Sequence, residues 1–98
     1  MKWSASFNSQ ARMELREAAA YYGLESESLR ERFLLAVEEA LKNVVAHPEA
    51  AAMVRGDVRR KPLRRFPYSL LYTIRDHEVR ILAVMHQRRR PFYWWGRG

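Results

Sequence analysis

The chain is 98 residues long, and its apolar content of 48% is typical of one small folded domain rather than of a disordered chain. It contains no cysteine, which excludes a disulfide framework, a thiol nucleophile and a cysteine-ligated zinc site and fits a reducing cytoplasm. No apolar run approaches the roughly 20 residues that span a membrane, and the N-terminus lacks the apolar segment of a signal peptide. We therefore expect a single cytoplasmic domain over residues 1–98.

The net charge of +7 is concentrated in the second half of the chain. Residues 1–50 carry six basic and eight acidic side chains, whereas residues 51–98 carry twelve basic and three acidic ones. Fifteen of the eighteen basic residues are arginine, whose guanidinium group binds carboxylates and phosphates through two parallel hydrogen bonds and stacks on aromatic rings. This asymmetry favours an anionic or carboxylate-bearing partner over a basic surface that is only solvated.

The first elements are a short strand and a helix. Alternation of apolar and polar residues predicts a strand with one buried face. The alternating residues are Trp3, Ala5 and Phe7 on one side and Lys2, Ser4 and Ser6 on the other. Asn8 or Ser9 offers an N-cap for the helix that follows, and Gly23 is expected to end it. Its apolar stripe comprises Ala11, Leu15, Ala18 and Tyr22.

The second helix is the strongest secondary-structure signal in the chain. Ser26 or Ser28 is expected to begin it, and Ser28 with Glu31 fits a capping box. Pro48 is expected to stop it. Its apolar positions are Leu29, Phe33, Val37, Ala40, Leu41 and Val44. Because only a few residues separate the two helices, they should form an antiparallel hairpin.

The remainder of the chain predicts three strands. Residues 48–58 read as a loop with a turn at 56–57, and the strand over 58–65 contains Pro62, which is typical of an edge strand. Strands over 68–75 and 79–86 are joined by a hairpin loop at 75–78. The fold class is therefore α+β: an N-terminal strand, an antiparallel helix hairpin and a three-stranded antiparallel sheet (β-α-α-β-β-β), with the helices on one face.

Two-residue alternation divides the last two strands into a wholly apolar face and a face of mixed character. We expect the apolar face to pack under the helices and the mixed face to contact a partner. The apolar face comprises Tyr68, Leu70, Tyr72, Ile74, Val79, Ile81, Ala83 and Met85. The mixed face comprises Ser69, Leu71, Thr73, Arg75, Arg80, Leu82, Val84 and His86, and it would lie beside the basic, aromatic tail at 88–95.

Four segments, which cover almost the whole chain in order, carry a family resemblance. They are A-A-A-Y-Y at 18–22, R-F-L-L-A-V-E-E-A-L at 32–41 followed by Pro48, R-R-F-P-Y-S-L-L-Y-T-I at 64–74, and I-L-A-V-M-H-Q-R-R-R-P-F-Y-W at 81–94. The patterns F-P-Y-x-x-x-Y and H-x-R-R-x-P-x-Y-W are fairly specific as a pair. Together these segments resemble the RelE/ParE superfamily of toxins from bacterial type II toxin–antitoxin systems, and the ParE branch in particular.

The resemblance implies a compact toxin that forms a hetero-oligomer with a cognate antitoxin. Family antitoxins lay an acidic, amphipathic C-terminal segment across the toxin, so acidic residues would pair with arginines and apolar residues would cover Leu71, Leu82 or Val84. The candidate antitoxin- or target-binding residues are Arg59, Arg60, Arg64, Arg65, Leu71, Arg75, Arg80, Leu82, Val84, His86, Arg88, Arg89, Tyr93 and Trp94.

The two branches of the superfamily differ in their target. RelE-like toxins are ribosome-dependent mRNA endonucleases, whereas ParE-like toxins poison DNA gyrase. Cleavage of RNA by its own 2′-OH requires a proton acceptor, cations and a proton donor. The RelE arginine of the hairpin strand corresponds to Ser69 here, and one of two basic positions on the preceding strand corresponds to Pro62. This broken set favours the ParE branch and a protein that is not an enzyme.

The alternative is a metal-independent endoribonuclease acting on mRNA at the ribosome. Its residues would be Arg60, His86 as general base, Arg89 and Tyr93, with Asp57 as a further carboxylate. His86 could equally be a strand-end histidine that is hydrogen-bonded to the backbone or stacked on Tyr93.

Binding to nucleic acid or to a membrane surface, without catalysis, has less support in the sequence. A plain nucleic-acid-binding module stays open, whereas a membrane-surface binder is disfavoured because the aromatic residues and arginines do not share one amphipathic helix. The three histidines are scattered and no glycine-rich phosphate loop is present, so we expect no metal ion and no other cofactor. Of the adjacent Trp94 and Trp95, we expect one to be buried and one to be partly exposed.

Overall fold

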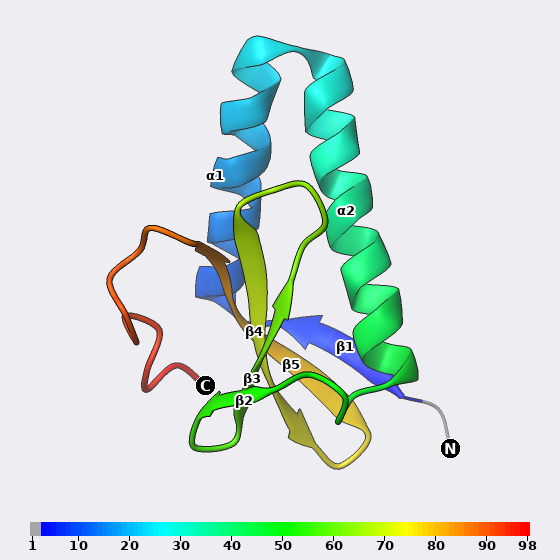
Figure 1. Ribbon diagram of the computed structural model, residues 1–98, viewed down its shortest axis with the longest axis vertical. Helices are drawn as coiled ribbons and strands as arrows, with labels where there is room; N and C mark the ends of the chain where they lie inside the picture. Colours follow the sequence, from blue (N-terminus) through cyan, green and yellow to red (C-terminus); the bar gives the residue numbers. More distant parts are fainter. Residues whose placement is uncertain (1–2) are drawn as a thin grey trace.

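The computed structural model describes residues 3–98 and shows two antiparallel helices on one face of a five-stranded sheet (Figure 1). The elements are β1 (Ser4–Phe7), α1 (Ser9–Glu25), α2 (Glu27–Ala46), β2 (Met53–Arg55), β3 (Val58–Pro62), β4 (Tyr68–Arg75) and β5 (Glu78–His86). The expected α+β architecture is confirmed. The sheet is mixed rather than three-stranded and antiparallel: its order is β1-β5-β4-β3-β2, and β1 runs parallel to β5.

β1 forms where the alternation predicted a strand, but its burial is less regular. Trp3 and Phe7 pack against the core, whereas Ala5 is exposed because β1 lies at the edge of the sheet. Lys2 lies outside the described residues. Asn8 is the N-cap of α1, and its buried side-chain oxygen accepts a hydrogen bond from the backbone N–H of Ala11 at 2.7 Å.

The helix hairpin is confirmed, but Gly23 does not end α1. The helix continues to Glu25, and Ser26 caps both helices, accepting the N–H of Leu29 at 3.0 Å in place of the expected capping box at Ser28. A Cβ on Gly23 would lie 3.2 Å from Cδ of Arg30, so this glycine serves the close approach of the two helices. α2 ends at Ala46, before Pro48, as predicted.

The segment predicted as a loop contains β2, and β3 is shorter than expected. β2 is only three exposed residues long, which is too short for an alternating pattern to identify. β2, rather than β3, is therefore the edge strand. Pro62 is nevertheless tolerated because β2 pairs only with Val58 and Arg59, which leaves the outer edge of β3 free at the proline. The turn at 56–57 is confirmed, with Gly56 at a φ of 56°.

A β-bulge in β5 changes the two predicted faces of the hairpin. Leu71 pairs with Ala83 and Tyr72 with Ile81, so Leu82 is an extra residue between them. Beyond the bulge the alternation is reversed. Val84 therefore packs under the helices, whereas Ala83, together with Met85, lies on the opposite face.

The opposite face of the sheet is not open, because the C-terminal tail covers it. Trp94 is only 2% exposed and packs on Val58, Leu71, Leu82 and Ala83, whereas Trp95 is 49% exposed. The expectation of one buried and one partly exposed tryptophan is confirmed. Four candidate contact residues are instead core residues that offer no surface to a partner: they are Leu71, Leu82, Val84 and Trp94. Within residues 3–98, no helix is long and apolar enough to cross a membrane.

Candidate interaction site

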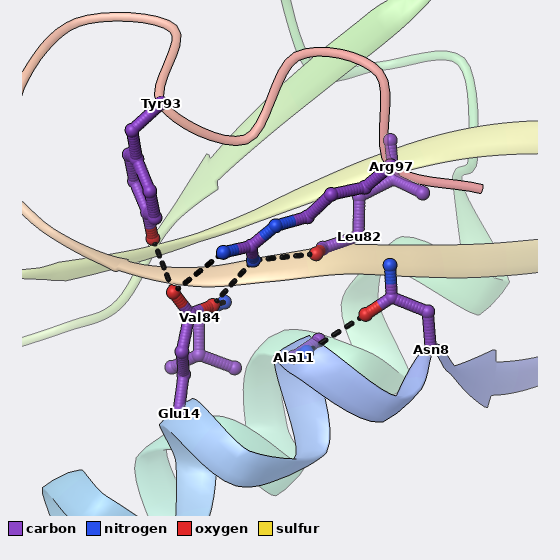
Figure 2. Close-up of polar contacts among 7 residues, drawn as sticks. All are labelled: Asn8, Ala11, Glu14, Leu82, Val84, Tyr93 and Arg97. Carbon is purple, nitrogen blue, oxygen red and sulfur yellow. Dashed lines mark hydrogen bonds and ion pairs between the residues drawn. The ribbon is translucent and has the colours of Figure 1, made fainter.

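Glu14 on α1 binds three separate parts of the chain (Figure 2). Its Oε1 accepts the backbone N–H of Val84 at 3.0 Å and a guanidinium N–H of Arg97 at 2.9 Å, and its Oε2 accepts the hydroxyl of Tyr93 at 2.8 Å. The ion pair is largely buried, with the Arg97 and Glu14 side chains 13% and 15% exposed. Arg97 also donates to the carbonyl of Leu82 at 3.1 Å. Glu14 therefore anchors the tail to α1 and β5.

The backbone groups that Glu14 and Arg97 bind lie where β5 has lost a neighbouring strand. β1 pairs with β5 only as far as Ile81. Beyond that point the N–H of Val84 and the carbonyl of Leu82 need other partners, and the two charged side chains supply them. The tail thus completes the sheet edge that β1 leaves open.

Tyr93 is held as a neutral hydrogen-bond donor. Burial raises the pKa of its hydroxyl well above the usual value for tyrosine, and the hydrogen bond to the Glu14 carboxylate raises that pKa further. The ring also stacks under the guanidinium group of Arg89, 4.0 Å from the ring centroid. Its contacts are therefore those of an anchoring residue.

His86 lies beside Tyr93 in a hollow of about 270 Å³ that Glu17, Tyr68 and Arg89 also line. Its Nδ1 accepts the backbone N–H of Arg88 at 3.0 Å. A neutral imidazole with this nitrogen occupied carries its proton on Nε2 and presents a donor to the hollow. The ring meets Tyr68 edge-on at 4.9 Å, rather than Tyr93. In this arrangement His86 has no free nitrogen to act as a general base.

Arg60 lies on the other face of the sheet from His86. Its Nε donates to Ser69 Oγ at 3.0 Å, and it lines a hollow of about 250 Å³ together with Phe92 and Trp94 of the tail. Among the four residues that an RNase would use, Arg89 alone lines both hollows. Asp57 is in the turn between β2 and β3, and it lines neither hollow. The structure therefore does not bring the expected nuclease set into one site.

Several predicted contact arginines bind the protein itself. Arg59 donates to the carbonyls of Glu49 and Ala51, both at 2.8 Å, and thereby holds the loop after α2. Arg80 donates to Ser6 Oγ at 3.1 Å and also to two backbone carbonyls. Arg55, which the sequence did not single out, lies 4.8 Å from the ring of Phe92 and 4.4 Å from that of Trp95.

The remaining predicted arginines are exposed. Arg75 is at the end of β4, and Arg88 follows β5. Arg64 and Arg65 lie in the loop between β3 and β4, where they border a hollow against α2. This second location is remote in the chain from the tail and brings arginines next to a helix that the sequence analysis assigned to the core alone.

Glu14 and Arg97 are the residues that the sequence analysis missed. Glu14 lies three residues after Ala11 and four before Ala18, so the helical period places it beside the buried stripe rather than on the opposite face. That position was the available signal. Among residues 3–98, no group of three or more histidine, aspartate or glutamate side chains could hold a metal ion.

Comparisons with known proteins identify the family. Comparison with curated proteins gives no match. A solved structure described as "Chromosomal ParDE TA system from P. aeruginosa" has a similar fold, with a TM-score of 0.65 and 23% sequence identity over 88% of this chain and 96% of that chain. The family model of the ParE toxin of the type II toxin–antitoxin system parDE matches residues 5–91, which include all the helices and strands but not the end of the tail. The chain belongs to the ParE family of toxins from type II toxin–antitoxin systems.

Proposed function

We propose that this ParE-family toxin inhibits DNA gyrase in the cytoplasm and is neutralised by a cognate antitoxin. The observation that carries the choice of target is the separation of Arg60 from His86 on opposite faces of the sheet. RNA cleavage would require a proton acceptor and phosphate-binding cations around one scissile bond. With these groups apart, a protein target explains the toxin better than a nuclease site does.

The state of the other nuclease candidates supports the same choice. The Nδ1 of His86 accepts a backbone N–H, and the hydroxyl of Tyr93 donates to Glu14. Both groups would have to break a hydrogen bond before they could transfer a proton. An antitoxin partner is supported by the family and by the similar structure, which is described as a ParDE toxin–antitoxin system.

Gyrase supercoiling of a relaxed plasmid tests the target. We expect the purified chain to abolish supercoiling and the antitoxin to restore it. Because a protein of net charge +7 can also coat DNA, relaxation by topoisomerase I at the same salt concentration serves as the control and should be unaffected. Unaltered supercoiling at saturating toxin would rule out gyrase as the target.

The alternative function is ribosome-dependent cleavage of mRNA. It is favoured by one feature, the lining of a single hollow by His86, Arg89 and Tyr93. Incubation of the toxin with programmed ribosomes distinguishes the two functions: we expect intact mRNA, whereas site-specific cuts that disappear in the His86→Ala variant would replace the gyrase proposal.

A further inference from the structure

A continuous trough runs along α2, on the side that faces β3 and the loop after it. Three hollows of about 440, 210 and 360 Å³ adjoin one another there. The first and second share Ala36, Glu39 and Arg64. The second and third share Asn43, Lys61 and Pro62. The α2 residues that line the trough begin at Leu29 and end at Val44, and His47 follows the helix. At 1.5 Å per residue these positions span roughly 27 Å.

The floor of this α2 trough is apolar. Leu35 is 55% exposed although it lies in the middle of α2, and Leu29 and Phe66 line the same hollow. Ala40 and Val44 continue the apolar floor toward the other end. An exposed apolar strip of this length, bordered by charged residues, is typical of a binding surface. Leu35 falls outside the buried helical stripe, so packing within the domain does not require a leucine there.

The rim of the trough is basic. Its cationic side chains are Arg32, Arg60, Lys61, Arg64 and Arg65, against the single carboxylate of Glu39. Among the described residues, Arg64 and Arg65 form no hydrogen bond or ion pair through their side chains, unlike Arg59, Arg80 and Arg97 elsewhere in the protein. These two guanidinium groups are therefore available to carboxylates of a partner.

Arg65 also has a left-handed backbone, with φ at 68°. This conformation is uncommon for a residue with a side chain, and residues held in it cluster at binding and switch sites. The turn directs two consecutive arginines to the end of the trough near Leu29. A loop shaped in this way fits a role in contact with a partner better than a role as a simple connection.

We propose that the α2 trough binds an amphipathic, acidic peptide segment of the antitoxin, whose apolar side chains cover Leu35 and Phe66 while its carboxylates pair with Arg64 and Arg65. The source of the peptide rests on the proposed function, whereas its chemistry follows from the trough itself. A nucleic acid fits less well, because its backbone would bring phosphates against Glu39 and leave the leucines uncovered. The site is distinct from the sheet face, which the tail already occupies.

Titration of the ¹⁵N-labelled full-length protein with a synthetic peptide tests the proposal. The probe is a helical peptide of about 18 residues, matched to the roughly 27 Å trough, with leucine on one face and glutamate on the other. We expect chemical-shift changes at 29–47 and 60–66. A double variant, Arg64→Glu with Arg65→Glu, should bind the peptide at least tenfold more weakly.

The matched control is the double variant Arg12→Glu with Arg16→Glu, which makes the same change in net charge at two exposed positions of α1. It should change the affinity less than twofold. A third variant, Leu35→Ser, should weaken binding about fivefold through the apolar floor alone. All three variants change exposed positions, and the spectra report directly whether each variant is folded.

Three results would overturn the proposal: equal losses in the trough and control variants, equally tight binding of a peptide with lysine in place of glutamate, or shifts confined to 88–98. Displacement of the peptide by a single-stranded oligonucleotide at equal concentration would instead assign the trough to nucleic acid. The gyrase assay is read separately. A trough titration as expected, with no inhibition of supercoiling, would remove the gyrase target and leave the trough assigned.

Discussion

At the scale of single residues, Glu14 replaces a missing strand. Its carboxylate binds the backbone of β5 where β1 has ended, and Arg97 binds the same stretch from the other side. Removing a partner from such a largely buried pair leaves an uncompensated charge, which costs more than the pair itself contributes.

We expect Glu14→Gln to lower the free energy of unfolding by about 2–4 kcal/mol, somewhat less than is typical of a fully buried pair, because both side chains are slightly exposed. Urea denaturation of the wild type and the variant measures this change. Glu17→Gln, an exposed position on the same helix, is the control and should have an effect of at most about 0.5 kcal/mol. Similar losses in the two variants would contradict the role given to Glu14.

Tyr93 predicts a pH dependence at the same scale. Its pKa is raised in the folded state by burial and by Glu14, while an unfolded tyrosine titrates near pH 10. A raised folded-state pKa contributes stability that is fully present below about pH 10 and is lost as the pH rises toward the folded-state value. The stability advantage of the wild type over Tyr93→Phe should therefore shrink between pH 9 and pH 11. Urea denaturation across this range checks it, and a constant difference would contradict it.

At the scale of elements, the tail acts as a cover for the second face of the sheet. Trp94 fills the space over Leu71 and Leu82, whereas the exposed Trp95 mainly stacks on Arg55. The segment is attached at both sides, by Glu14 and by Arg55. Residues 92–98 lie beyond the family match, so this cover is a feature of the chain that the family alone does not specify.

The two adjacent tryptophans provide a matched comparison. Trp94→Ala should cost about 3–5 kcal/mol because it removes a buried aromatic side chain, and Trp95→Ala should cost less than about 1 kcal/mol, the contribution of an exposed cation–π contact. Thermal and urea unfolding of the two variants measures these costs. Equal sensitivity at the two positions would show that the tail does not cover the sheet in solution.

At the scale of the whole molecule, the uneven charge controls association. The second half of the chain contributes twelve basic residues against three acidic ones, and an acidic antitoxin would be steered toward this half before contact.

We expect the association rate with the antitoxin to fall at least tenfold when the salt concentration is raised from about 0.1 to 1 M, since the Debye length shortens from about 10 to 3 Å. The dissociation rate should change much less, because the contacts in the trough are partly apolar. Stopped-flow fluorescence measures the two rates. A dissociation rate that carries most of the salt effect would contradict electrostatic steering.

Much of the fold was predictable, because its signals are local. The apolar stripe of α2, the Asn8 cap and the turn at 56–57 each depend on residues within a few positions of one another. The same holds for the four segments that resemble the family. Gly23 was misinterpreted because a glycine that permits two helices to approach has the same local sequence as one that ends a helix.

The candidate site was less predictable, because its contacts join distant parts of the chain. Arg64 and Arg65 were identified as contact residues from charge alone, but the exposed Leu35 that faces them belongs to a helix 29 residues earlier. In the same way, the nuclease candidates looked like one set along β5 and the tail, and the sheet separates them onto two faces.

The sequence by itself determined the order of elements, the helix hairpin and the family, since periodicity and capping arise from hydrogen bonds between near neighbours. The tertiary structure alone decided which residues a partner can reach. One extra residue at Leu82 reversed the faces of β5, and Tyr93 and Arg97 reached back 79 and 83 positions to Glu14 to close the sheet. Such choices depend on which surfaces the folded chain brings together, and local patterns carry no record of them.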